Sequence, residues 1–186
     1  MRSHLLLFML LAVAHSQVSA QKFFTKSGRI DFNATAPSSP ETIEAVNRTV
    51  TCVLDAATGQ LQFAVLIKGF TFERALMQEH FNENYLESDK YPKAEFKGAI
   101  TNNSAVNYAK DGDYTVTVKG KLTMHGETRD VESSGKISVK GGKISASANF
   151  NAVLGDYKVA VPALVSDKVS KTAKITVACT LEPLKS

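Results

Sequence analysis

Apolar and polar residues alternate with a period of two along most of this chain, and no other feature constrains its fold as strongly. One apolar face per segment is typical of antiparallel sheets with one buried and one solvated side. Turn signals such as Asp111-Gly112 and Gly141-Gly142 separate several of the segments. The pattern predicts eight strands, near residues 24–32, 46–54, 61–67, 95–100, 114–124, 131–139, 144–152 and 175–181.

Eight antiparallel strands can close into a barrel whose interior holds one small ligand. A sandwich of two sheets is the alternative, and periodicity alone does not separate the two. Between the third and fourth strands, Phe72, Leu76 and Phe81 recur at helical spacing, which predicts one amphipathic helix over 72–84 that packs on one end of the barrel. A second segment without strand periodicity, 156–168, is expected to flank or plug a mouth.

Length and composition point to one folded domain. The chain has 186 residues, of which 44% are hydrophobic and 22% charged, and this excludes a disordered chain or a disulfide-dense mini-protein. Its formal charge is +4, and acidic residues are interleaved with the lysines. No nucleic-acid partner is therefore expected.

The first 20 residues have the pattern of a secretory signal peptide. Arg2 precedes the apolar run 5–14, and Val18 and Ala20 occupy the −3 and −1 positions of a cleavage site. Cleavage after Ala20 would leave 21–186 as the barrel domain, in the periplasm or outside the cell. A bilayer span needs roughly 20 apolar residues, so no stable membrane span is expected.

No catalytic constellation is evident. The sequence has no Gly-x-Ser-x-Gly elbow, no phosphate-binding loop and no Cys-x-x-Cys pair. His80 and Glu83 would share a helix face, where a metal site is one interpretation and a solvated surface the other. His125 falls in a turn with no nucleophile placed beside it. The sequence therefore predicts a protein that is not an enzyme and has no catalytic residue, metal or cofactor.

Cys52 and Cys179 both fall on the inward face of their strands. A disulfide is one interpretation if the compartment is oxidising, and two buried free thiols are the other. On strands two apart their backbones would be roughly 9–10 Å from each other, beyond the ~7 Å limit for a bridge.

The inward face also carries small residues on five strands, including Gly28, Gly98, Gly120 and Gly135. Small side chains leave volume unfilled, which indicates a ligand in a tightly packed interior. Alternatively, glycines let barrel strands coil and bend. The residues predicted to line the lumen and contact a ligand share the inward parity of their strands. They are Phe32, Phe63, Val65, Phe96, Gly98, Tyr114, Val116, Val118, Gly120, Gly135, Phe150 and Val177.

Three runs of residues resemble the YceI-like family over about 22–184. The most specific is the predicted helix followed by Ser88-Asp-Lys-Tyr-Pro-Lys-Ala-x-Phe96, and the second is Gly120-x-Leu-x-x-His-Gly-x-Thr128. The third is the segment 156–177. Glu127 departs from the pattern, because the family more often has an apolar residue there.

The resemblance implies a lipocalin-like barrel whose lumen holds a polyisoprenoid chain, such as an isoprenoid quinone, or another long amphiphile. Family members are usually periplasmic or secreted bacterial proteins and are often dimeric, so a homodimer is consistent with the resemblance. The resulting hypothesis is a carrier or sequestering protein for a long apolar lipid. The alternatives are an interaction module with a fully packed barrel and a lipid-modifying enzyme, for which the chain offers no nucleophile.

Overall fold

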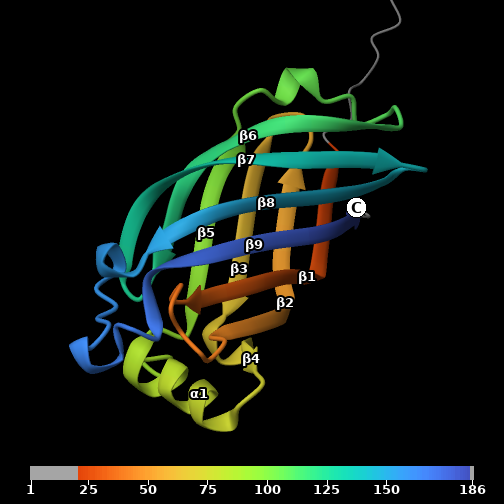
Figure 1. The fold of residues 1–186 in the computed structure, drawn as a ribbon. Coiled ribbons are helices and arrows are strands. Elements are labelled where there is room, and N and C mark those ends of the chain that lie inside the picture. Colours follow the sequence, from red (N-terminus) through yellow and green to blue (C-terminus); the bar gives the residue numbers. More distant parts are fainter. Residues whose placement is uncertain (1–20, 185–186) are drawn as a thin grey trace, which may run out of the picture.

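The computed structural model describes residues 21–184, which form a closed antiparallel β-barrel (Figure 1). The hydrogen-bonded order is β1-β9-β8-β7-β6-β5-β3-β2, and pairing of β1 with β2 closes the barrel. This confirms the predicted eight-stranded barrel over the sandwich, while the predicted signal peptide lies outside the described residues. The barrel strands are β1 (Lys22–Thr35), β2 (Glu44–Asp55), β3 (Gln60–Leu66), β5 (Lys93–Ile100), β6 (Gly112–Met124), β7 (Glu127–Lys140), β8 (Lys143–Val153) and β9 (Val169–Pro183).

Strand β1 departs from strict alternation. Its register with β2 shifts between Thr25 and Gly28, where a bulge inserts one extra residue. Phe23 and Thr25 are therefore buried inside the barrel, whereas Phe24 is only half-buried, with the Lys26 ammonium 5.8 Å from its ring. Strict alternation predicts Phe24 on the same inward face as Gly28, Ile30 and Phe32. This prediction is wrong, because a bulge reverses the parity of the residues on one side of it.

The wall of the barrel is incomplete between β7 and β8. Their pairing ends at Gly135 and Ala148, although β7 begins at Glu127 and β8 continues to Val153. Beyond the last pair, β7 stays hydrogen-bonded to β6 and β8 to β9. The sheet is thus split over this stretch.

The segment between β3 and β5 crosses the same end of the barrel (Figure 1). It consists of the 3-10 turn η1 (Ile67–Gly69), the two-residue strand β4 (Thr71–Phe72), the helix α1 (Ala75–His80) and the π-helical turn η2 (Phe81–Tyr85). The helix begins three residues later than predicted, because Phe72 pairs with Ala45 of β2 and Arg74 keeps extended dihedrals. None of the helices in the described part of the chain is long and apolar enough to cross a membrane.

Two of the three predicted helix contacts exist. Phe72 and Phe81 are buried against the barrel, but Leu76 is 56% exposed. The prediction for Leu76 is wrong because the regular helix extends only from 75 to 80 and turns this residue outward. Three short 3-10 turns complete the fold: η3 (Asn103–Ala105), η4 (Leu154–Tyr157) and η5 (Ala163–Val165).

Candidate functional site: an apolar cavity in one half of the barrel

The half of the barrel remote from α1 is filled by its own side chains. Leu54, Ile144 and Leu181 are completely buried there, and the ring of Tyr108 stacks on that of Phe23 at 6.3 Å. We call this half the core end, defined by one cluster of buried residues: Phe23, Cys52, Leu54, Leu61, Ile100, Val106, Val116, Ile137, Val139, Ile144, Cys179 and Leu181.

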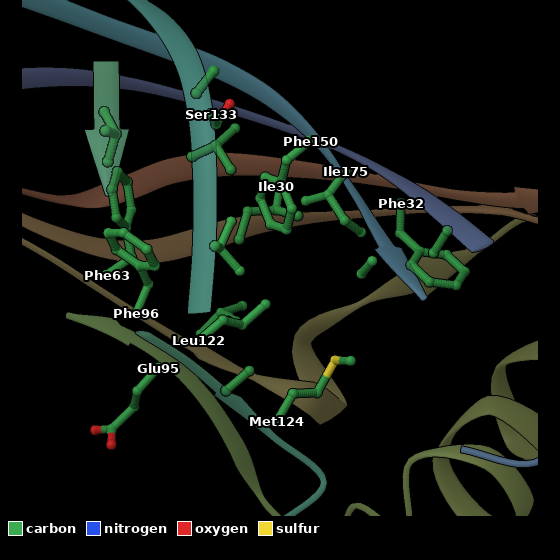
Figure 2. Close-up of a pocket in the computed structure, with 18 of the residues that line it drawn as sticks. Ile30, Phe32, Phe63, Glu95, Phe96, Leu122, Met124, Ser133, Phe150 and Ile175 are labelled. Carbon is green, nitrogen blue, oxygen red and sulfur yellow. The ribbon is translucent and has the colours of Figure 1, made fainter. Parts of the chain in front are cut away.

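The other half, which we call the cavity end, encloses a cavity of about 140 Å³ (Figure 2). Leu61, Ile100, Val116 and Ile137 of the core end line the inner limit of this cavity. Apolar side chains from seven strands and from the segment 67–86 surround it, and Leu122, Met124 and Phe150 remain only half-buried because they face it. Four polar residues also border the cavity: Glu95, Ser133, Lys136 and Ser147. The Glu95 carboxylate points away from it (Figure 2) and accepts a hydrogen bond from Lys93 at 2.8 Å, and the Lys136 ammonium lies 2.8 Å from the Asp113 carboxylate. The interior is thus suited to an apolar ligand.

Two glycines and two phenylalanines lie at the boundary between the two halves. Phe63 and Phe96 meet edge to face, with their ring centroids 6.3 Å apart. Gly98 and Gly120 are paired on β5 and β6, and a Cβ on Gly120 would lie 2.5 Å from the Gly98 Cα and 2.6 Å from Cζ of Phe96. The Phe96 ring therefore occupies the space that these two glycines leave.

The structure brings eight of the twelve predicted lumen residues to the cavity: Phe32, Phe63, Val65, Phe96, Val116, Val118, Phe150 and Val177. Gly98, Tyr114, Gly120 and Gly135 are not among the residues that line it. A Cβ on Gly135 would lie 2.8 Å from the Ser147 carbonyl oxygen, and Tyr114 packs against the core end. The glycines therefore permit close backbone contact and do not hold the cavity open.

Several lining residues were not predicted. Four of them lie on predicted strands and have the same parity as the residues predicted to face inward, so the alternation also places them inside: Ile30, Leu122, Val131 and Ile175. Phe70 and Leu86 come from the segment between β3 and β5. Only the path of the chain across the barrel brings these two to the cavity, and no periodic signal marks that path.

His125 joins three segments at the cavity end. Its Nδ1 donates to the Tyr157 carbonyl oxygen at 2.9 Å, its Nε2 lies 2.7 Å from Oε2 of Glu87, and its ring meets that of Tyr91 edge to face. Glu87, His125 and Lys158 have positive φ values of 42°, 51° and 56°. Three left-handed residues at one junction indicate that these contacts fix the turns around the mouth.

Cys52 and Cys179 are free and buried at the core end. Gly28 lies between their strands, and a Cβ there would approach Sγ of Cys179 to 2.6 Å. The neighbouring Cys179 thiol and burial together raise the pKa of the Cys52 thiol. Cys52 is thereby kept protonated, as expected of a small core residue.

The histidine of α1 has no metal-binding environment. His80 and Glu83 are both exposed, which agrees with a solvated helix face. Across residues 21–184, no three His, Cys, Asp or Glu side chains gather in a way that could hold a metal ion.

Solved structures of similar fold come from three bacteria. The polyisoprenoid binding domain from Saccharophagus degradans has a TM-score of 0.75 at 12% identity, covering 89% of this chain and 99% of that one. Burkholderia cenocepacia BcnA has a TM-score of 0.64 at 16% identity, covering 83% and 95%. The Campylobacter jejuni YCEI protein has a TM-score of 0.52 at 18% identity, covering 74% and 81%. At these identities the likeness establishes the fold.

No curated protein matches the chain in sequence. The model of the YceI-like domain matches residues 10–181, which is most of the chain. The protein therefore belongs to the YceI-like family.

Proposed function

We propose that this protein binds a long apolar chain, a polyisoprenoid or a similar amphiphile, with the chain in the cavity end of the barrel. One observation carries the proposal: the barrel keeps a cavity of about 140 Å³ that is lined mainly by apolar side chains, although buried side chains fill the end remote from α1. The similar fold of a polyisoprenoid binding domain supports it.

Binding would occur by burial without chemistry. Each buried methylene contributes about 0.8 kcal/mol, against which the ordering of a flexible chain must be set. A protein of this kind would carry or sequester its lipid and would not be an enzyme. We further propose that it does so as the chain 21–186, in the periplasm or outside the cell, after removal of residues 1–20.

The test is the lipid that co-purifies with the protein, measured by native mass spectrometry and by extraction. Ala148 faces the cavity from β8, whereas Asn151 on the same strand is exposed. Ala148→Leu should fill part of the cavity and reduce bound lipid while the barrel stays folded, and Asn151→Leu should leave bound lipid unchanged.

A wild-type protein that carries no lipid from its own cells, and binds none when offered geranylgeraniol, would exclude the proposal. The alternative would then be an interaction module whose outer surface binds a protein.

A further inference from the structure

The His125 ring connects three segments at one side of the cavity: the turn between β6 and β7, the residues that follow η2, and η4. Met124 directly precedes His125, and Leu86 directly precedes Glu87. Each of the three segments carries a residue that lines the cavity: Met124, Leu86 and Leu154. The contacts of one imidazole ring therefore hold three parts of the cavity wall together.

The turn η4 lies where the barrel wall is split. It follows β8 directly and packs against β7, β8 and β9 at the end of the barrel where β7 and β8 are no longer paired (Figure 1). Nδ1 of His125 donates to the Tyr157 carbonyl oxygen of η4 at 2.9 Å, and the Lys158 ammonium lies 2.5 Å from Oε1 of Glu127. The side chain of Lys158 is 73% exposed and that of His125 only 9%. Because an exposed ion pair contributes little, His125 is the stronger link between η4 and the β6–β7 turn.

Both partners of the His125 ring accept hydrogen bonds and cannot donate them. Nδ1 faces the Tyr157 carbonyl oxygen, and Nε2 lies 2.7 Å from the Glu87 carboxylate. A neutral imidazole has one N–H and one lone pair, so it satisfies one acceptor, whereas the protonated ring donates to both. In the neutral ring, one of the two contacts would bring two lone pairs together in a site shielded from water. The arrangement therefore fits the imidazolium form.

Histidine is the side chain whose charge ordinarily changes near neutral pH. Between about pH 5.5 and about pH 8.5, carboxylates, lysines and arginines keep their charge and tyrosines stay neutral. Besides Glu87 and His125, the titratable side chains of 87–91, 125–129 and 154–158 are Asp89, Lys90, Tyr91, Glu127, Arg129, Asp156, Tyr157 and Lys158. A change of pH in this range therefore acts on these three segments through His125.

We propose that His125 is a proton-dependent latch on the cavity. The protonated ring holds η4 and the residues after η2 to the β6–β7 turn at the same time, and loss of its proton releases one of the two. The wall then opens more often at the split between β7 and β8, and a bound apolar chain exchanges faster. The effect on exchange rests on the proposed function, whereas the effect on the wall requires no ligand.

The first experiment measures how fast geranylgeraniol leaves the loaded protein for phosphatidylcholine vesicles, at about pH 5.5 and at about pH 8.5. Loss of one charge-assisted hydrogen bond predicts release about tenfold faster at the higher pH. Equal release rates of the wild type at the two pH values would overturn the latch and leave the proposed function intact.

Glu87→Gln separates the latch from a general effect of pH. The glutamine amide has nearly the same shape and can donate to an unprotonated Nε2, while Nδ1 of His125 still donates to Tyr157. The ring then keeps both contacts with or without its second proton, so release from this variant should be independent of pH. A pH dependence that persists in Glu87→Gln would contradict the proposal. Glu83→Gln is the matched control, because it removes the same charge from an exposed residue of η2 and should keep the wild-type pH dependence.

The second experiment uses the protein without lipid. NMR follows the nitrogens of the His125 ring and the backbone amides of Lys158 and Val159 as the pH is raised. In the wild type the ring and the amides should change over the same pH range, and in Glu87→Gln the amides should stay constant. Amides that do not move while the wild-type ring loses its proton would exclude the latch. If the protein binds no geranylgeraniol, the proposed function fails, and this titration still decides whether the latch exists.

Discussion

The core end and the cavity end are built from the same strands and the same alternation, yet only one of them is filled. At the core end, β7 and β8 are paired and Leu54, Ile144 and Leu181 are inaccessible to solvent. At the cavity end the β7–β8 pairing stops, and Leu122 and Phe150 face a hollow. One barrel therefore combines a half that stabilises the fold with a half that is free to hold a ligand.

The largest difference between the halves should be in stability. Leu54→Ala removes a fully buried side chain from the core end and should lower the free energy of unfolding by about 2–5 kcal/mol. Leu122→Ala enlarges an existing hollow and should cost clearly less. Urea unfolding of both variants measures this difference, and equal losses would mean that the two halves contribute alike.

The glycine pair at the boundary should tolerate no side chain. A Cβ on Gly120 would meet backbone atoms, the Gly98 Cα and the Lys97 carbonyl oxygen, both at 2.5 Å. Gly120→Ala should therefore destabilise the barrel by about 1–3 kcal/mol. Gly155→Ala is the control, because nothing lies within 4 Å of its Cβ position. An unchanged melting temperature for Gly120→Ala would show that the strands can separate at no cost.

His125 should stabilise the cavity end in particular. His125→Phe keeps an aromatic ring beside Tyr91 but leaves the Tyr157 carbonyl and the Glu87 carboxylate without their nitrogen partner. The expected loss is about 1–3 kcal/mol, with faster amide hydrogen exchange near the mouth than at the core end. His80→Phe, on the exposed face of α1, should change neither quantity.

The smallest effect concerns alkaline pH at the core end. Burial raises the pKa of Tyr108 to about 12 from its ordinary value of 10.0. Above pH 10.0 the unfolded chain loses this proton while the folded chain retains it, so stability should fall as the pH rises towards about 12. The melting temperature of Tyr108→Phe should fall less over that pH range than that of the wild type. Equal falls in the two proteins would contradict the raised pKa of Tyr108 as the cause.

The sequence predicts most of the barrel and part of the site. Alternation is a local signal, so it finds the strands and inward residues such as Phe63, Phe96 and Phe150. A bulge depends on how neighbouring strands pack, and alternation within one strand does not reveal it. The predicted inward orientation of Phe24 is therefore wrong. Parity also does not show which half of the barrel is filled, and so it wrongly predicts that Tyr114 and Gly120 line the cavity.

The connecting segments were the least predictable. The π-helical turn that places Phe81 beside the cavity follows from tertiary contacts with Phe32 and Phe72, whose ring centroids lie 5.5 and 5.0 Å away. Spacing in the sequence indicates a helix there but not its early end, and it therefore assigned Leu76 to the buried face.

The most direct test of the division between the two halves is an NMR titration of methyl-labelled protein with geranylgeraniol. We expect the methyl signals of Leu122, Met124 and Ile175 to shift, because these side chains border the cavity. The methyl groups of Leu54, Ile144 and Leu181 should remain unchanged, because they are buried at the core end. Shifts confined to the core end, or no shifts at saturating lipid, would contradict the claim that the cavity end is the binding site.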